Sequence, residues 1–384
     1  MKINNTVNST IYLALLMLGM GYSGAQEPET RKVIPARQGG KVVPAEVMNE
    51  IYQKIKTPFK YGVVLKGEKP GQKVDSPGVF KHGDKWYMTY ITFEGKGYES
   101  SIAVSDDLLT WKPIGKTLPF LEGTWDAVQA AGYPALQDHT FGGSYELGKY
   151  DSKYWMSYLG GNLKGYEADP LKIGMAYTTD PTTPKPWTRL PEPVLSRDQA
   201  DCRPWEALTQ YKSNIIHDKE ETLGYPFVMF YNAKTKSGYE VIGMAVSKDM
   251  KKWFRYGDKP VLDHGKGLTA DPQITKIGDV WVMFYFGAGY QPPVGKGGAF
   301  ERFACSYDLV NWTDWQGANL VESSEPWDKK YAHKPWVVVH NDVVYHFYNA
   351  VGNQGRVIAL ATSKNLKAET KKKMNLGVQA LPFP

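Results

Sequence analysis

An internal repeat is the feature that most limits how this chain can fold. Four segments carry an alternating apolar stretch, then a Ser/Thr-x-Asp turn, then a tryptophan: AVSDDLLTW (103–111), AYTTDPTTPKPW (176–187), AVSKDMKKW (245–253) and ACSYDLVNW (304–312). A fifth, degenerate copy, ALATSKNL, spans residues 359–366. The aspartate of such a turn accepts backbone hydrogen bonds, and the tryptophan covers the surface of a sheet. The self-similarity predicts one supersecondary unit that occurs five times.

A long apolar strand precedes each copy. The five strands are GDKWYMTY (83–90), SKYWMSYLG (152–160), GYPFVMFYNA (224–233), GDVWVMFYFG (278–287) and NDVVYHFYNA (341–350). Their period-two pattern of aromatic and β-branched residues, bounded by turn residues, is typical of central strands. A short proline-containing segment opens each unit: VDSPGVF, AGYPALQ, CRPWEAL, ADPQITK and HKPWVVV. Units of this kind predict an all-β fold, a five-bladed β-propeller of four-stranded blades.

The residues that precede the repeats divide into two segments. Residues 1–25 combine Lys2, an apolar run at 11–20 that is too short to span a bilayer, and a small-x-small site that ends at Ala25. They predict a signal peptide and a secreted or periplasmic protein with no membrane association once it is removed; a membrane anchor is the alternative. Residues 26–58 predict an N-terminal extension with an amphipathic helix at 45–55.

The propeller is expected over residues 59–384. The segment at 59–65, FKYGVVL, predicts a strand that closes the ring against the last blade.

Composition excludes several other classes of protein. The net charge is +6, and the chain has neither a basic helix nor the aromatic-basic alternation of a nucleic-acid binder. The two cysteines, Cys202 and Cys305, are too few for a disulfide framework and predict no metal site.

Candidate functional residues lie beside the prolines that open the units. In a propeller the first strand of each blade lines the central tunnel, so these side chains are expected to converge there. Charged residues on buried strands are costly unless they are paired or functional. The acidic candidates for catalysis are Asp75, Glu206 and Asp271, and the candidates for substrate binding are Tyr133, Asp138, Arg203, Trp205, His333 and Lys334.

Each candidate also has a structural interpretation. Asp75 can cap a Ser-Pro turn, Asp271 can initiate an Asp-Pro turn, and Glu206 can form a salt bridge. His333 can be a buried core histidine, and Asp138 can be an ordinary loop residue.

The pattern resembles the five-bladed glycoside hydrolases of family 43 and their relatives, which include the sucrose-, fructan- and arabinan-acting families and family 117. The resemblance covers about residues 59–366, and it rests on the repeat, on Asp75, on Asp271-Pro272 and on the histidine of HKPWVVV. It implies a glycosidase that cleaves a plant or algal oligosaccharide or polysaccharide with general acid and base carboxylates, with inversion. It allows a structural calcium ion on the axis beside His333, and it implies no other cofactor.

The resemblance also implies roles for the three acids. Asp75 matches the general base, and Glu206 and Asp271 share the roles of general acid and pKa modulator. The family places the aspartate in the third blade and the glutamate in the fourth, and here the two are exchanged. The working assignment makes Glu206 the acid and Asp271 the modulator.

Glycoside cleavage needs one protonated and one ionised carboxyl group, and clustered acids beside cations provide both. Arg203 and Lys334 are suitable cations, and they can instead bind an acidic group of the sugar. Two other functions stay open: a carbohydrate-binding propeller without catalysis, and a phosphorylase in which Arg203, Lys334 and Arg356 hold phosphate.

Overall fold

The computed structural model describes residues 31–368, and the predicted signal peptide, residues 1–25, lies outside the described residues. The described residues belong to one compact unit that begins at Arg31. Its secondary structure is almost entirely β, with the α-helix α1 (Ala45–Ile55) and the short 3-10 helix η1 (Pro204–Glu206). Among these residues, no helix is both long and apolar enough to cross a membrane.

The strands form three sheets, of four, eight and nine strands. Each of the two larger sheets consists of two antiparallel units that a single parallel residue pair joins, between β4 and β6 in one and between β12 and β14 in the other, so the antiparallel units number five. The first unit contains β2 (Lys73–His82), β3 (Lys85–Phe93), β4 (Tyr98–Ser105) and β5 (Lys112–Leu118). The second contains β6 (Gln129–Pro134), β7 (Tyr154–Gly161), β8 (Lys172–Thr178) and β9 (Thr188–Arg189). The third contains β10 (Thr209–His217), β11 (Phe227–Lys234), β12 (Glu240–Ser247) and β13 (Phe254–Arg255).

The fourth unit contains β14 (Leu268–Ile277), β15 (Val280–Ala288) and β16 (Ala299–Ser306), and both β17 (Thr313–Asp314) and β18 (Val321–Glu322) pair with β16. The fifth contains β19 (Tyr331–His340), β20 (Val343–Gly352) and β21 (Gly355–Thr362), and its outer strand is β1 (Phe59–Leu65). The predicted helix and the predicted pairing of the first strand with the last repeat are therefore confirmed.

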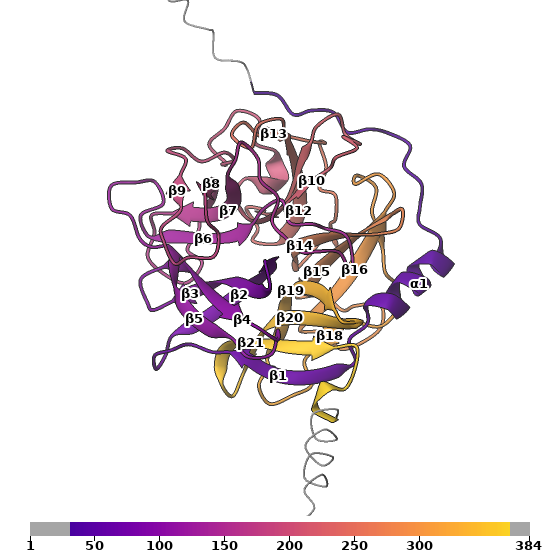
Figure 1. Ribbon diagram of the computed structural model, residues 1–384. Coiled ribbons are helices and arrows are strands. Elements are labelled where there is room, and N and C mark those ends of the chain that lie inside the picture. Colours follow the sequence, from indigo (N-terminus) through magenta and orange to yellow (C-terminus); the bar gives the residue numbers. More distant parts are fainter. Residues whose placement is uncertain (1–30, 369–384) are drawn as a thin grey trace, which may run out of the picture. The chain divides into compact units, whose positions relative to one another are not determined.

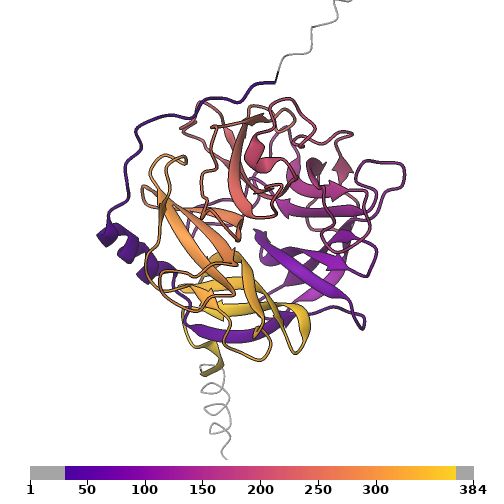
Figure 2. The same cartoon turned by 180° about the vertical axis from the view of Figure 1, so that it is seen from behind.

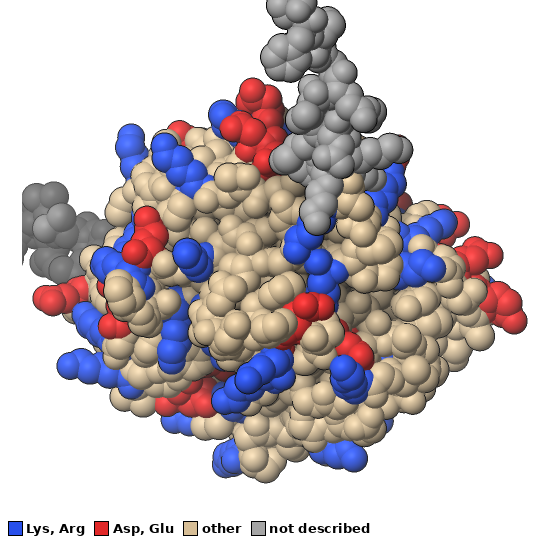
Figure 3. All heavy atoms as spheres, turned by 90° about the horizontal axis from the view of Figure 1, so that it is seen from below, with Lys and Arg blue, Asp and Glu red and all other residues tan. Residues whose placement is uncertain are grey.

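The first strands of the units meet in a closed cycle, in which β2, β6, β10, β14 and β19 each contact the first strands of both neighbouring units. Figure 1 shows the units arranged around this common centre. Seen from behind, in Figure 2, helix α1 lies on the outside of the ring. Its buried residues Met48, Ile51 and Ile55 pack with the cores of the fourth and fifth units. In the view of Figure 3, basic and acidic side chains are interspersed.

The repeated turn has the structure that its residues predict. In the third unit, Asp249 Oδ1 accepts hydrogen bonds from the backbone N–H groups of Lys251 and Lys252 at 2.9 and 2.7 Å. Met250 adopts a positive φ of 60°, and Trp253 Nε1 donates to its carbonyl oxygen at 3.0 Å. The turns of the first and fourth units repeat this pattern, with Leu108 and Leu309 at positive φ.

Four of the first strands contain a β-bulge in their pairing with the second strand of the same unit. The pairing register shifts between Asp75 and Gly78, Tyr211 and Ser213, Ala270 and Gln273, and His333 and Trp336. Each bulge contains one residue with a left-handed backbone: Ser76, Lys212, Asp271 and Lys334, with φ between 41° and 66°. Bulges of this kind redirect a side chain away from the ladder. They turn the polar side chains of these strands toward the axis.

A buried ionic cluster fixes the start of the third unit. Glu206, at the end of η1, is fully buried and forms ion pairs with Arg203 and Arg255. Tyr231 Oη donates to Glu206 Oε2 at 2.6 Å, and Arg255 Nη1 lies 2.6 Å from Asp201 Oδ1. Burial favours the neutral carboxyl group, but the charges of Arg203 and Arg255 hold the pKa of Glu206 below its usual value. The geometry therefore supports the salt-bridge interpretation of this glutamate.

This cluster predicts a stability defect for Glu206→Ala. Removing the carboxylate leaves two buried guanidinium groups without their shared partner, so the free energy of unfolding should fall by about 3–5 kcal/mol. Chemical denaturation measures the change. The matched control is Glu94→Ala, which breaks an exposed pair with Lys69 and should cost less than about 1 kcal/mol. A variant at Glu206 that keeps the wild-type stability and loses turnover would restore the catalytic assignment made from the sequence.

Candidate active site

A cavity of about 460 Å³ lies where the first strands of the fourth and fifth units begin. Its charged lining comes from Glu167, Lys212, Glu240, Lys334 and Arg356, together with His333. The rest of the lining is aromatic, aliphatic or glycine: Tyr166, Gly267, Leu268, Phe286, Ala288, Gly289, Gly298, Ala299 and Tyr331. A concave site with a few convergent charges and an aromatic wall is typical of a ligand pocket.

Two glutamates share this cavity. Glu167 lies in the connection between β7 and β8, with a left-handed backbone at φ 50°, and Glu240 is the first residue of β12. The Glu240 N–H donates to the carbonyl oxygen of Gly267 at 2.9 Å, which fixes the start of β12 beside the fourth unit. Both carboxyl groups are thus presented from backbone positions that tertiary contacts hold in place.

The environments of these glutamates drive their pKa values apart. Glu167 Oε2 lies 2.8 Å from Lys212 Nζ and 3.8 Å from Lys334 Nζ, and it accepts a hydrogen bond from Tyr98 Oη at 3.3 Å. Burial opposes ionisation, but these two ammonium groups lower the pKa of Glu167 to about 2. Burial, and then the charge of Glu167, raise the pKa of Glu240, although Lys234 Nζ lies 3.6 Å from its Oε1.

Asp75 lies beside the cavity. It is almost fully buried, and its Oδ2 lies 3.0 Å from Lys334 Nζ and 3.2 Å from Arg356 Nη1 and also accepts a hydrogen bond from Tyr166 Oη. Burial disfavours the charge, but Lys334 and Arg356 hold the pKa of Asp75 far below its usual value. This carboxylate organises three side chains that line the cavity, and it does not line the cavity itself.

His333 is held in one tautomer by its two neighbours. Its Nδ1 lies 3.0 Å from the carbonyl oxygen of Asn349, which can only accept, so Nδ1 carries the proton. Its Nε2 then accepts a hydrogen bond from Arg356 Nη1 at 3.1 Å. Burial and the charges of Arg356 and Lys334 hold the pKa of His333 well below its usual value. Both ring nitrogens are therefore occupied by the protein.

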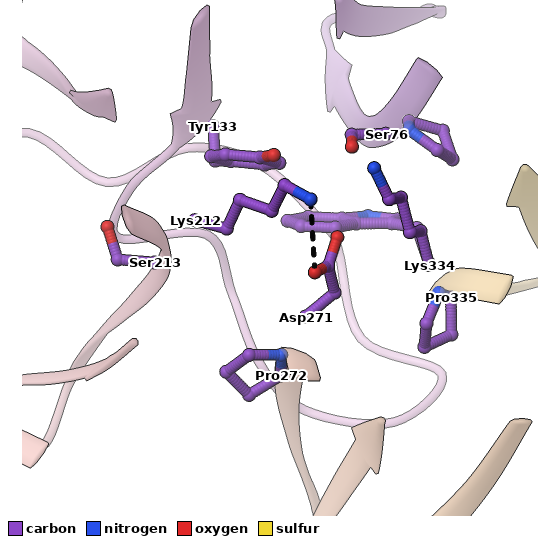
Figure 4. A pocket seen from close by; sticks show the side chains of 10 residues that line it. Ser76, Tyr133, Lys212, Ser213, Asp271, Pro272, Lys334 and Pro335 are labelled. Carbon is purple, nitrogen blue, oxygen red and sulfur yellow. Dashed lines mark ion pairs between the residues drawn. The ribbon is translucent and has the colours of Figure 1, made fainter. Parts of the chain in front are cut away.

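A second, smaller cavity lies on the axis. Figure 4 shows Ser76, Tyr133, Lys212, Asp271 and Lys334 around it, with the Lys212–Asp271 ion pair at 3.8 Å. The side chain of Asp271 also accepts a hydrogen bond from Asn232 Nδ2 at 2.8 Å. Burial raises the pKa of Asp271 above its usual value.

A calcium ion does not fit this axis. Two ammonium groups point into the axial cavity, and a divalent cation prefers a cage of oxygen ligands. Both nitrogens of His333 are used, and residues 31–368 contain no group of three or more acidic, histidine or cysteine side chains placed to hold a metal ion.

The structure brings together some of the residues expected from the sequence and separates others. Tyr133, Asp271 and Lys334 line the axial cavity, and His333 and Lys334 line the larger one. Neither cavity is lined by Arg203, Trp205 or Glu206. Arg203 and Glu206 belong to the buried ionic cluster, and Trp205 Nε1 donates to the carbonyl oxygen of Asp258.

Asp138 is also remote from both cavities. It caps a turn, where its Oδ2 accepts hydrogen bonds from the N–H and hydroxyl groups of Ser144 at 2.7 Å. It lines a different cavity of about 480 Å³, which includes His217 and Lys276 at the far ends of β10 and β14.

Sequence reasoning missed three charged residues of the site. Lys212 occupies in β10 the position that Asp271 occupies in β14, but a serine and not a proline follows it. Aligning TQYKSNIIH with LTADPQITK would have found it. Glu167 and Glu240 do not lie on first strands, so a search beside the opening prolines could not reach them.

Comparison with known proteins gives a match among solved structures. No protein-family profile and no curated protein sequence matches the chain. A structure of BT0996, named as a complex with RGII, is 48% identical with a TM-score of 0.80, and the match covers 84% of this chain and 96% of that one. A structure named Glycoside hydrolase matches with the same values.

More remote structures share the fold. Zg3597, a family 117 glycoside hydrolase from the marine bacterium Zobellia galactanivorans, is 15% identical, covers 80% of this chain and 91% of its own, and has a TM-score of 0.58. A thermostable family-43 glycoside hydrolase is 16% identical with a TM-score of 0.53, over 77% of this chain and 90% of its own. The family resemblance inferred from the repeat is confirmed. Because 48% identity extends over nearly the whole of a solved glycoside hydrolase, this protein belongs to the glycoside hydrolases.

Proposed function

We propose that this glycoside hydrolase cleaves a glycosidic bond of the plant polysaccharide RGII, with Glu240 as the general acid and Glu167 as the ionised carboxylate that acts with it. The observation that carries the proposal is the pair of glutamates in one cavity whose pKa values are displaced in opposite directions. Pairs of titratable groups driven apart in this way identify acid and base assignments. The substrate class rests on the 48% identical structure, which is named as an RGII complex.

The chemistry follows from the two protonation states. Glu240 keeps its proton at a pH where an ordinary glutamate has lost it, so it can protonate the leaving oxygen. Glu167 stays ionised because of Lys212 and Lys334, and it stabilises the positive charge that develops on the sugar. We retain the inverting outcome, in which Glu167 takes a proton from the attacking water; the anomer released first, followed by proton NMR, tests it.

In this proposal Asp75 and Asp271 are positioning residues. Asp75 fixes Lys334, Arg356 and Tyr166 at the cavity, and Asp271 faces Lys212 from the axial side. The general base and acid assigned from the sequence, Asp75 and Glu206, are thus replaced by Glu167 and Glu240.

We further propose that the five units are the blades of a β-propeller. The closed cycle of first strands and the pairing of β1 with β21 support this architecture, and the family 43 and family 117 structures share the fold. Export of the enzyme by residues 1–25, to the periplasm or the exterior, remains part of the proposal.

The amide variants Glu167→Gln and Glu240→Gln test the assignment. Each should lower kcat for sugar release from RGII oligosaccharides by about 10²- to 10⁴-fold, because each removes one proton-transfer or charge-stabilising group. The melting temperature of Glu240→Gln should stay close to that of the wild type, whereas Glu167→Gln should also lower it because Lys212 and Lys334 lose a partner, so kcat is measured at a temperature where each variant is fully folded. The matched control is Glu146→Gln, which lies in the cavity at the far ends of the first strands and should keep full activity. Full turnover in both Glu167→Gln and Glu240→Gln would show that these two glutamates are not the catalytic pair.

The pH profile tests the part played by Lys212. Activity requires Glu167 ionised and Glu240 protonated, so it is lost as pH falls through the pKa of Glu167 and as pH rises through that of Glu240. The Lys212 ammonium group, 2.8 Å from Glu167, lowers the pKa of both glutamates, and Lys212→Met removes it. Both limbs of the profile of kcat/KM should therefore move to higher pH, and Lys212→Arg should move them back. A uniform fall in rate with unmoved limbs would mean that Lys212 has only a structural role.

A further inference from the structure

The carboxyl group of Glu240 stands beside a lysine that it shares with a second acid. Glu240, the first residue of β12, is paired directly with Lys234 at the end of β11, so the two side chains lie on the same face of the sheet. Lys234 is paired in turn with Thr209, the first residue of β10. The three residues form one row across the third unit, and the strands on both sides fix where the Lys234 side chain starts.

The ammonium group of Lys234 is bound to one carboxylate and only approaches the other. Its Nζ donates a hydrogen bond to Asp169 Oδ2 at 2.9 Å, whereas Glu240 Oε1 lies 3.6 Å away, beyond hydrogen-bonding distance. Asp169 lies in the connection between β7 and β8, and its Oδ1 accepts a hydrogen bond from Thr209 Oγ1 at 2.6 Å. Both oxygens of Asp169 are therefore engaged, and they hold Lys234 on the Asp169 side.

Other elements surround Glu240 as well. The charged and titratable groups that face its carboxyl group are Glu167, Tyr211, Lys212 and Lys234. The hydroxyl group of Tyr211 lies within hydrogen-bonding reach of this carboxyl group, and Lys234 Nζ lies 5.1 Å from the centre of the Tyr211 ring. The residues of the fourth unit that meet the Glu240 backbone, Gly267 and Leu268, carry no charge.

The contact between Lys234 and Asp169 matters because Glu240 needs its proton. An ammonium group that binds a carboxyl group favours the ionised form, whereas a general acid must stay protonated at the pH where the enzyme works. Asp169 takes the hydrogen bond of Lys234 and offsets part of its charge. The pKa of Glu240, which burial and then the charge of Glu167 raise, agrees with this arrangement.

We propose that Asp169 is a positioning residue of the reaction: by holding the Lys234 ammonium group away from Glu240, it lets this glutamate keep the proton that it gives to the leaving oxygen. The proposal rests on the role of Glu240 as the general acid. Neither Asp169 nor Lys234 lines the active-site cavity, so both act through Glu240 and not on the sugar. Without Asp169, the same lysine binds Glu240 and ionises it.

The variant Asp169→Asn tests this role. The amide keeps an oxygen for Thr209 but presents an NH₂ group to Lys234, which then turns to Glu240. The limb at high pH of the profile of kcat/KM for RGII oligosaccharides should move to lower pH by about one unit, since a nearby opposite charge lowers the pKa of a carboxyl group by about 1–3 units. The limb at low pH should stay nearly in place. A merely structural role of Asp169 predicts a uniform fall in rate with both limbs unmoved.

Removing the lysine should act in the opposite direction. Lys234→Met should move the limb at high pH to higher pH, and the limb at low pH by less, because Lys212 and Lys334 still face Glu167. The double variant Asp169→Asn/Lys234→Met should match Lys234→Met, since Asp169 then has no lysine to hold. The matched control is Asp198→Asn, which removes the carboxylate of an ion pair with Lys172 and should leave both limbs in place.

Carbon-13 NMR of the glutamate carboxyl groups measures the same effect without turnover, with the Glu240 signal identified by its loss in Glu240→Gln. The titration midpoint of Glu240 should fall in Asp169→Asn and rise in Lys234→Met. Thr209→Val, which frees Asp169 Oδ1, should give a smaller fall and serves as the test if Asp169→Asn does not fold.

An unmoved Glu240 midpoint in Asp169→Asn, or a fall of equal size with and without Lys234, would overturn the role of Asp169. Failure of the proposed function gives a different result: Glu240→Gln then keeps full turnover, while the midpoint of Glu240 still responds to Asp169 and Lys234.

Discussion

The central constraint on this structure is the mutual neutralisation of charges buried around the axis. Asp75, Glu167, Lys212, Lys334 and Arg356 come from the first, second, third and fifth units, and each ion pair joins two of these units. None of these charges is tolerable in a protein interior alone, since an isolated buried ion costs several kcal/mol. The units are therefore bound electrostatically at their centre as well as by the apolar packing between their sheets.

Backbone geometry makes this network accessible to a ligand. A regular first strand would alternate its side chains between the two faces of its own sheet. The bulges at Ser76, Lys212, Asp271 and Lys334 break this alternation and turn polar groups toward the axis, at the cost of a left-handed backbone in non-glycine residues. A left-handed backbone in these residues persists only where surrounding contacts hold it in place. Here the ion pairs and the closed cycle of first strands supply those contacts.

Much of the fold could be predicted from the sequence, because the turn motif and the alternating strands are local signals. The site was only partly predictable. Asp271 and Lys334 were found because a proline follows each, and Lys212 was missed because none does. Glu206 stands near a proline too, but that segment is η1, one turn before the strand that reaches the axis. Glu167 and Glu240 reach the cavity through tertiary contacts that no local pattern encodes.

The pairing of β1 with β21 has a consequence for synthesis. Phe59 and Thr362, which are opposite one another in this pair, are 303 positions apart, so the ribosome makes the outer strand of the fifth unit long before the other three strands of that unit. Until nearly the whole polypeptide has been released, β1 has an unpaired edge, which is a template for association with other polypeptides. A truncated product that ends before β21 would expose this edge permanently.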